Sequence, residues 1–135
     1  MRNISIIFVL LLLFGLSGTA QASELVLKGN AAKDVLKMGY ETSALIDAVL
    51  PCFGDKMNGK TPDKSEAFYN CVCVKNNVEA IVIFKKLVSI YENHPAWASY
   101  STVTAEKTEG RVTVSESIDI DEFKKMHNAV RPCLK

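Results

Sequence analysis

Apolar residues recur every three or four positions between residues 30 and 50, which is the spacing of an amphipathic helix. Gly39 is expected to divide this helix into two pieces. Pro51 is expected to end it, because proline lacks the backbone N–H that a helix interior needs. The glycines and the asparagine within residues 52–60 then predict a loop.

A second helix is predicted to start at the Thr61-Pro62 pair, with threonine as the N-cap and proline in the first turn, and to end near Asn76. Asn76 and Glu79 match a capping box for a third helix. The β-branched run at residues 81–83 would also suit a strand, but about 15 residues without glycine or proline favour a helix. Because only a narrow face of this helix is polar, we expect it at the centre of the core.

Two short runs rich in β-branched residues, 100–105 and 111–118, flank a polar segment at 106–110. The second run alternates apolar and polar residues, so the three segments predict a β-hairpin with its turn at 106–110. A last helix follows, with Asp119 as its N-cap and Glu122 completing a capping box. Its expected buried stripe consists of Phe123, Met126, His127 and Val130.

The N-terminus has the three parts of a secretory signal peptide: a basic start, an apolar stretch, and small residues before a cleavage site. Ala20 and Ala22 place cleavage between Ala22 and Ser23. The apolar stretch of about 13 residues is shorter than the roughly 20 that a membrane-spanning helix needs. We therefore predict a signal peptide over residues 1–22, a single disulfide-stabilised domain over 23–135, and a periplasmic or secreted location.

Charge is nearly balanced, with 16 lysines and arginines against 15 aspartates and glutamates. Cleavage would remove Arg2 and leave no net charge, so nucleic acid is not an expected partner, and no membrane span is expected. The sequence contains no phosphate loop, dinucleotide fingerprint, zinc signature or nucleophile elbow. We therefore predict no cofactor and no catalytic residue.

Four cysteines fall after the predicted cleavage site, and an even number in a small exported chain is typical of two disulfides. A bridge between Cys71 and Cys73 would be strained, because a single residue separates them. Two pairings remain open: Cys52 with Cys71 and Cys73 with Cys133, or Cys52 with Cys73 and Cys71 with Cys133.

The Cys71-Val72-Cys73 sequence has two further interpretations, a redox pair or part of a metal site. A redox thiol is usually activated near a helix start, whereas Cys71 is predicted late in its helix. A metal site would favour two Cys-x-x-Cys units, which this chain lacks. Structural bridges are therefore preferred, and a thiol-based redox or metal-handling role is the alternative function.

A candidate protein interface comprises Trp97, Tyr100, Lys107 and Arg111. Trp97 is the only tryptophan: exposed, it would anchor an interface, and buried, it would pack the corner before the hairpin. The edge of the hairpin is also able to pair with an extended segment of a partner. The two histidines, His94 and His127, could each serve as a general base or a metal ligand, but a helix end and an apolar helix face favour structural roles for them.

Residues 68–134 contain mid-chain cysteines, a helix ending in His94-Pro95, and a final helix closing on Pro132-Cys133. In an exported chain of this size, these features resemble the periplasmic immunity proteins of the type VI secretion amidase-immunity family. The resemblance implies a binding protein that blocks a peptidoglycan-cutting toxin and has no catalysis of its own. The chain departs from this all-helical family in its Cys-Val-Cys sequence and its predicted hairpin.

Together these patterns predict an α+β fold: a mainly helical small domain of three to four helices, with one β-hairpin before the C-terminal helix and two disulfides. The expected function is that of an exported, non-enzymatic binding protein of the cell envelope. Its partner would be another protein. The chain itself would be an inhibitor or immunity factor for that partner, or an envelope-assembly subunit.

Overall fold

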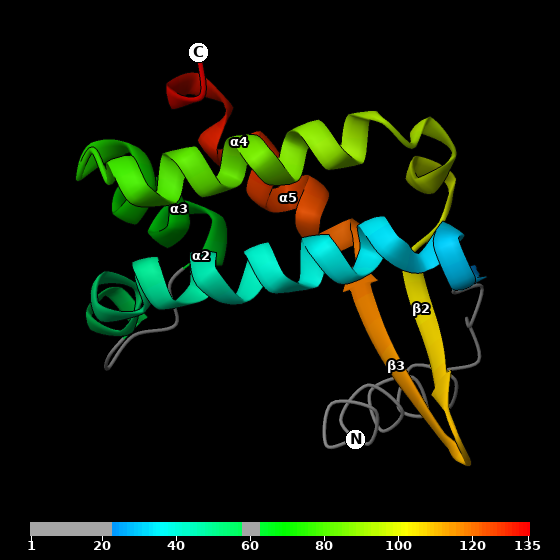
Figure 1. The fold of residues 1–135 in the computed structure, drawn as a ribbon. Coiled ribbons are helices and arrows are strands. Elements are labelled where there is room, and N and C mark those ends of the chain that lie inside the picture. Colours follow the sequence, from blue (N-terminus) through cyan, green and yellow to red (C-terminus); the bar gives the residue numbers. More distant parts are fainter. Residues whose placement is uncertain (1–22, 58–62) are drawn as a thin grey trace, which may run out of the picture. The chain divides into compact units, whose positions relative to one another are not determined.

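The computed structural model describes residues 23–57 and 63–135, so the predicted signal peptide and the Thr61-Pro62 start of the second helix lie outside the described residues. The described part contains four α-helices and a three-stranded sheet (Figure 1). The elements are β1 (Glu24–Lys28), α2 (Lys33–Met57), α3 (Lys64–Tyr69), α4 (Val78–Glu92), β2 (Thr102–Glu109), β3 (Val112–Asp119) and α5 (Ile120–Val130). The predicted α+β class, the hairpin before the last helix and the two disulfides are confirmed.

The described residues divide into two compact units, one formed by residues 23–39 and 95–120 and the other by 40–57, 63–94 and 121–135. The first unit contains the sheet, in the strand order β1-β2-β3. β1 runs parallel to β2, and β2 pairs antiparallel with β3. Its buried apolar side chains are Ala32, Val35, Met38, Trp97, Val103, Ala105, Ile118 and Ile120.

Strand β1 was not predicted from the sequence. Its five residues alternate between exposed and half-buried, with Leu25 and Leu27 on the less exposed side. Gly29, with a φ of 61°, ends the strand and leads into a 3₁₀ turn before α2. That backbone conformation lies in the left-handed region, which glycine enters without the steric cost of a Cβ atom.

The hairpin is longer and its turn tighter than predicted. Residues 106–109 belong to β2, and the turn consists of Gly110 and Arg111 alone. Gly110 has a φ of 63°, as the first central residue of a type II′ turn requires. The predicted turn at 106–110 is therefore wrong, because these polar residues pair across the strands instead of forming a loop.

The second unit contains the rest of α2 together with α3, α4 and α5. α2 continues through Gly39 and Pro51 to Met57, so the predicted division, the predicted stop and the first part of the predicted loop are wrong. Proline inside a helix costs about 3 kcal/mol. Cys52, the next residue, is still helical and is bonded to Cys71 on the turn after α3.

Two of the predicted helix starts are shifted. The N-cap of α3 is Asp63, whose carboxylate accepts a hydrogen bond of 2.9 Å from the backbone of Ser65. The N-cap of α4 is Asn77, whose side chain accepts one of 3.1 Å from Ala80. Asn76, the predicted cap, instead has a φ of 51° and turns the chain between the two helices.

The core of the second unit centres on α4, as predicted, and residues 81–83 are helical. Phe84 lies within ring-contact distance of Phe68 on α3 and Phe123 on α5, with ring centroids 5.9 and 5.6 Å apart. α5 follows Asp119 directly, at the position predicted for its cap. The buried apolar residues of this unit are Leu45, Val49, Ala67, Phe68, Cys71, Val72, Ala80, Ile83, Phe84, Leu87, Ile90, Phe123 and Val130.

Candidate functional site

The four cysteines form two disulfides within the second unit, Cys52 with Cys71 and Cys73 with Cys133. This is the first of the two pairings that the sequence left open, and none of the four cysteines is free. Cys71 and Cys73 lie in a single π-helical turn, Asn70–Val74, and bridge to different parts of the chain. The turn therefore links the end of α2 and the C-terminal segment covalently.

His127 lies among the aromatic residues of the same unit. Its ring centroid is 6.0 Å from that of Phe84 and 5.9 Å from that of Phe123. Burial, and then the positive charge of Arg131, lower the pKa of His127, while Glu92 acts in the opposite direction. The described residues contain no group of three or more metal-binding side chains that could hold an ion. His127 itself packs against Phe84 and Phe123, on the helix face where the sequence places it.

The four residues of the predicted interface do not form one surface. Trp97 is 3% exposed and packs in the 3₁₀ turn Pro95–Ser99, so it occupies the buried position of the two alternatives. Tyr100 follows it, half-buried, and its backbone donates to the carbonyl of Trp97. Lys107 lies five residues, or about 16 Å, from the start of β2, and Arg111 lies in the turn at the far end of the hairpin.

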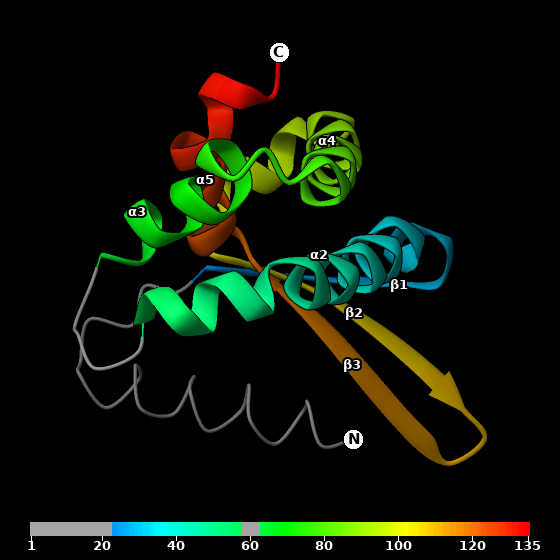
Figure 2. The same ribbon diagram turned by 90° about the vertical axis from the view of Figure 1, so that its left-hand side faces the viewer.

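The outer half of the hairpin, residues 107–114, is exposed at every position. Val112 and Val114 share a face of β3 with Ile118, as the alternation predicts, but only Ile118 is buried. The two valines are 45% and 37% exposed. β2 and β3 continue together beyond the end of β1 (Figure 2), so this half of the hairpin has no third strand in the described structure.

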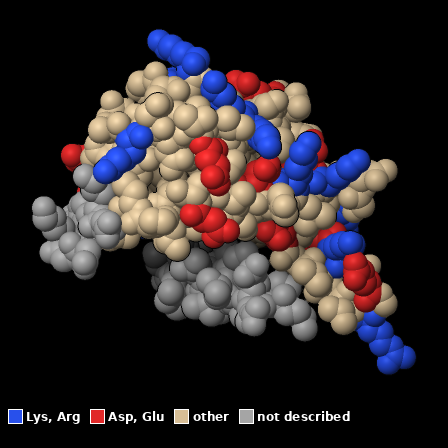
Figure 3. All heavy atoms as spheres, turned by 60° about the vertical axis from the view of Figure 1, so that its left-hand side comes forward, with Lys and Arg blue, Asp and Glu red and all other residues tan. Residues whose placement is uncertain are grey.

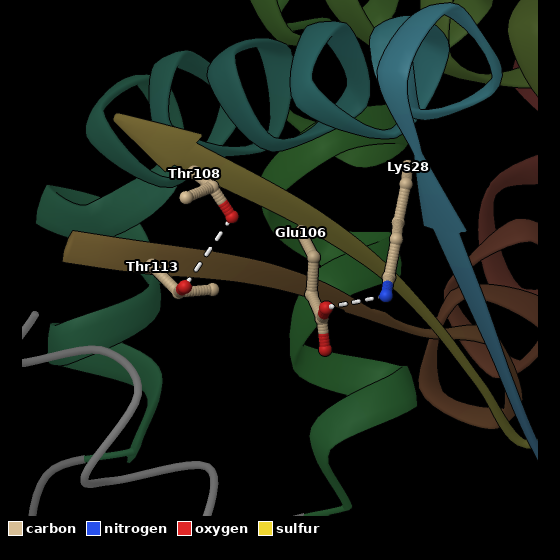
Figure 4. A network of polar contacts seen from close by, with 4 residues as sticks. All are labelled: Lys28, Glu106, Thr108 and Thr113. Carbon is tan, nitrogen blue, oxygen red and sulfur yellow. Dashed lines mark hydrogen bonds and ion pairs between the residues drawn. The ribbon is translucent and has the colours of Figure 1, made fainter. Parts of the chain in front are cut away.

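The outer edge of β2 has no strand partner where β1 stops, and the 3₁₀ turn Gly29–Ala32 lies near it. The last residue pair of β1 and β2 is Lys28 with Glu106, although β2 continues to Glu109. Thr108 lies on this uncovered stretch, opposite Thr113 of β3. Their hydroxyl oxygens are 3.3 Å apart (Figure 4).

A groove of about 490 Å³ adjoins this open edge within the first unit. Its walls come from the end of β1, the start of α2 and the free stretch of β2. Ala32 and Leu36 supply apolar surface, and Lys28, Lys33 and Lys107 supply basic side chains. Glu106 is the one acidic residue in the lining, so the groove carries an excess of positive charge.

Two of these lysines have carboxylate partners. The ammonium of Lys28 lies 3.6 Å from the carboxylate of Glu106, its register partner on β2 (Figure 4). Lys107 lies 2.9 Å from Glu109, and its hydrogen bond, followed by its charge, lowers the pKa of Glu109. Both lysines and Glu109 are solvent-exposed and Glu106 is half-buried, so an incoming carboxylate competes for the lysines at little cost.

Sequence reasoning identified Lys107 and Arg111 but missed Lys28, Lys33 and Thr108. The short alternation of Leu25 and Leu27 is the local signal that would have indicated a strand before α2. Its partner strand begins more than 70 residues later, and no pattern in one sequence predicts that pairing. Basic and acidic side chains are interspersed across the face in Figure 3. The nearly balanced charge of the whole sequence therefore gave no sign of a basic groove.

None of the helices in residues 23–57 and 63–135 combines the length and apolar character required to cross a bilayer. The two disulfides are typical of proteins in an oxidising compartment. Comparison of the chain with protein-family models, curated proteins and solved structures returns no match.

Proposed function

We propose that this chain is an exported, non-enzymatic protein of the cell envelope that binds another protein. The outer half of the hairpin carries the proposal. Its exposed residues include Val112 and Val114, and β2 presents an open edge beside a groove. Exposed strand edges are usually blunted or covered, because they pair readily with other chains. An open edge at a defined register is what a protein that recognises an extended segment requires.

The disulfide pairing favours this proposal over the thiol-based alternative. A redox pair made of Cys71 and Cys73 would bridge these two residues in its oxidised form, whereas each is bonded to a distant cysteine. Cys71 is also fully buried, which keeps its sulfur from other thiols. Redox or metal handling would require these bonds to open in the working protein.

The resemblance in residues 68–134 supports a role for this chain as an immunity factor. An immunity factor for a peptidoglycan-cutting toxin has to bind its target tightly and needs no chemistry. The C-terminal bridge from Cys73 to Cys133 suits such a role, because it fixes the last helix in an oxidising compartment. An envelope-assembly subunit is the second form that the same binding function would take.

Capture of partners from an envelope extract tests the proposal. The full chain would be expressed with a C-terminal tag, crosslinked in the extract, and its partners identified by mass spectrometry. Val112→Glu/Val114→Glu alters the exposed hairpin, and Val78→Glu/Val82→Glu makes the same change on exposed positions of α4. We expect one protein to be enriched by the wild type and the α4 variant but lost with the hairpin variant.

Two results would overturn the proposal. One is that no protein is enriched above a tag-only control. The other is that the purified chain reduces or exchanges disulfides of a test protein while it stays folded, which would favour the thiol-based function. In the immunity form, the captured protein cleaves peptidoglycan, and the purified chain abolishes that cleavage at equal molar ratio.

A further inference from the structure

Thr108 presents unpaired backbone groups to the open edge of β2. In a hairpin with a two-residue turn, the residues flanking the turn, Glu109 and Val112, form a hydrogen-bonded pair. Such pairs alternate with non-bonded pairs along an antiparallel ladder, so the N–H and C=O of Thr108 point away from β3. The same alternation places the N–H of Thr102 on the β1 side, where it donates to the carbonyl of Ser23.

β1 would have to extend by two residues to reach Thr108. It stops at Lys28, because Gly29 turns the chain into the 3₁₀ segment that leads to α2. The backbone of Thr108 therefore borders the groove, and no other described strand pairs with β2 beyond Glu106. An extended chain placed beside Thr108, past the turn Gly29–Ala32, would add to the sheet at this point.

The groove favours acidic side chains on that added chain. Lys107 lies on the same face of β2 as the buried Val103 and Ala105, and together with Lys33 at the start of α2 it lines the groove. Successive side chains of a strand point to opposite faces, so every second residue of the added segment would face these two lysines. Carboxylates at those positions complement the charge, and like charges would repel.

We propose that the groove binds an extended acidic segment of a partner protein, which adds as a strand beside Thr108 and directs alternate carboxylates toward Lys33 and Lys107. This inference rests on the proposed function and specifies how the partner is recognised. The main-chain hydrogen bonds to Thr108 supply the alignment, and the lysines supply the preference for acidic sequences.

A direct binding assay with a synthetic probe tests the site. The probe is a capped, fluorescently labelled peptide of seven residues that alternates threonine and glutamate, and the matched control has lysine in place of every glutamate. Fluorescence anisotropy with the full chain is expected to show at least tenfold tighter binding of the glutamate peptide. Because the contacts are solvent-exposed ion pairs, this binding should weaken as salt is raised.

Two substitutions at one position separate the backbone contact from the side chain. Thr108→Pro removes the outward N–H without removing a bond to β3, since proline is tolerated at edge positions of this kind. Thr108→Val keeps that N–H and loses only the hydroxyl contact with Thr113. We expect at least a tenfold loss of glutamate-peptide affinity for the proline variant and less than a threefold change for the valine variant.

A charge reversal tests the groove independently, and it decides the matter if the proline variant fails to fold. Lys33→Glu/Lys107→Glu should abolish the preference for glutamate, whereas the matched reversal Lys85→Glu/Lys86→Glu on α4 should leave it unchanged. Equal binding of the two peptides by the wild type, or tight binding that survives both groove variants, would overturn the inference.

A second copy of this chain is the competing occupant of the edge. Sedimentation of the wild type at micromolar concentration should show a monomer, and a dimer that Thr108→Pro dissociates would overturn the acidic-segment proposal. If the envelope extract yields a hairpin-dependent partner while the peptide assay fails, the proposed function stands and this inference falls. If no partner is captured, the proposed function itself fails.

Discussion

The side chain of Glu116 lies over Gly39, against the place where a Cβ atom of that residue would be. All three atoms nearest to this place belong to Glu116, and the terminal oxygen is the closest of them. Gly39 lies in the first two turns of α2. Glu116 lies on β3, opposite Ala105 of β2. The absence of a side chain at position 39 thus leaves room for the end of the Glu116 side chain against α2.

This contact predicts an unusual response to Gly39→Ala. In a helix interior that change normally stabilises by roughly 0.5–1 kcal/mol, because alanine loses less backbone entropy than glycine. Here the new methyl group displaces the flexible end of Glu116, so we expect the gain to be reduced in the wild-type background. In a Glu116→Ala background the full gain should return. Urea unfolding of the four proteins of this double-mutant cycle measures the coupling, and additive effects would contradict the contact.

Protonation of His127 should destabilise the protein in mild acid. Its pKa is lowered in the folded state, first by burial and then by Arg131, so the unfolded chain binds more protons. The stability that the neutral ring contributes is therefore present above the unfolded pKa of about 6.5 and is lost as the pH falls toward the folded value. Thermal melting between pH 5 and pH 8 should show this loss.

The control for that experiment is His127→Phe, which keeps a ring beside Phe84 and Phe123 but cannot be protonated. His94 is present in both proteins, so its contribution cancels in the difference. We expect a shallower decline in acid for the phenylalanine variant. Parallel pH profiles would assign the acid response to other groups.

Asn77 joins α4 to α2 as well as capping α4. Its side-chain oxygen accepts from the backbone of Ala80 at 3.1 Å, and its side-chain nitrogen donates to the carbonyl of Ala48 at 3.1 Å. Asn77→Ala should cost about 1–2 kcal/mol, at the upper end for an N-cap, since a second bond is lost with it. Asn77→Asp keeps the cap and loses only the donor, so it should cost less. Chemical denaturation of both variants ranks them, and equal losses would remove the Ala48 bond from the explanation.

The disulfide pairing predicts opposite thiol counts in two double variants. Cys52→Ser/Cys71→Ser removes one complete bridge and should leave no thiol that reacts with a labelling reagent. Cys52→Ser/Cys73→Ser removes one partner from each bridge and should leave two thiols, at Cys71 and Cys133. Counting labels by intact mass under denaturing conditions distinguishes them. The reverse result would indicate the other pairing.

Removal of the two bridges should also differ in cost. In the chain-entropy description, the bridge with a sequence separation of 60 contributes about 4 kcal/mol, and the one with a separation of 19 about 3 kcal/mol. Cys73→Ser/Cys133→Ser is therefore expected to be less stable than Cys52→Ser/Cys71→Ser. Equilibrium unfolding of the two oxidised variants measures the order of their stabilities. The opposite order would mean that native-state contacts of the bridges outweigh the difference in loop entropy.

Local sequence patterns correctly predicted the elements that are specified by neighbouring residues. The alternation around Ile118, the long apolar repeat of α4 and the position of Asp119 before α5 all lie within a few residues of what they specify. The three possible disulfide pairings were reduced to two, because a bridge between Cys71 and Cys73 would be strained. These predictions rest on backbone geometry and helix capping, which act over short distances.

The candidate site was beyond such patterns, because it is made by distant pairing. Lys28 faces Glu106 only because β1 and β2 pair in parallel, although more than 70 residues separate them in the sequence. Pro51 was misread because a local preference of about 3 kcal/mol does not by itself decide where a helix ends. Val112 shares a face of β3 with Ile118, as the alternation predicts, but only Ile118 is buried, because what covers each end of a strand is a tertiary property.

Val72 is the only residue between the two cysteines that lie in the π-helical turn. In a denatured but oxidised chain, the bridges from these cysteines form two covalent rings that meet at this valine. A single peptide-bond cleavage within either ring would open it without releasing a fragment. The chain from Cys52 to Cys133 would therefore remain one covalent piece after a protease cut in each ring, until a reductant reaches the sulfur atoms.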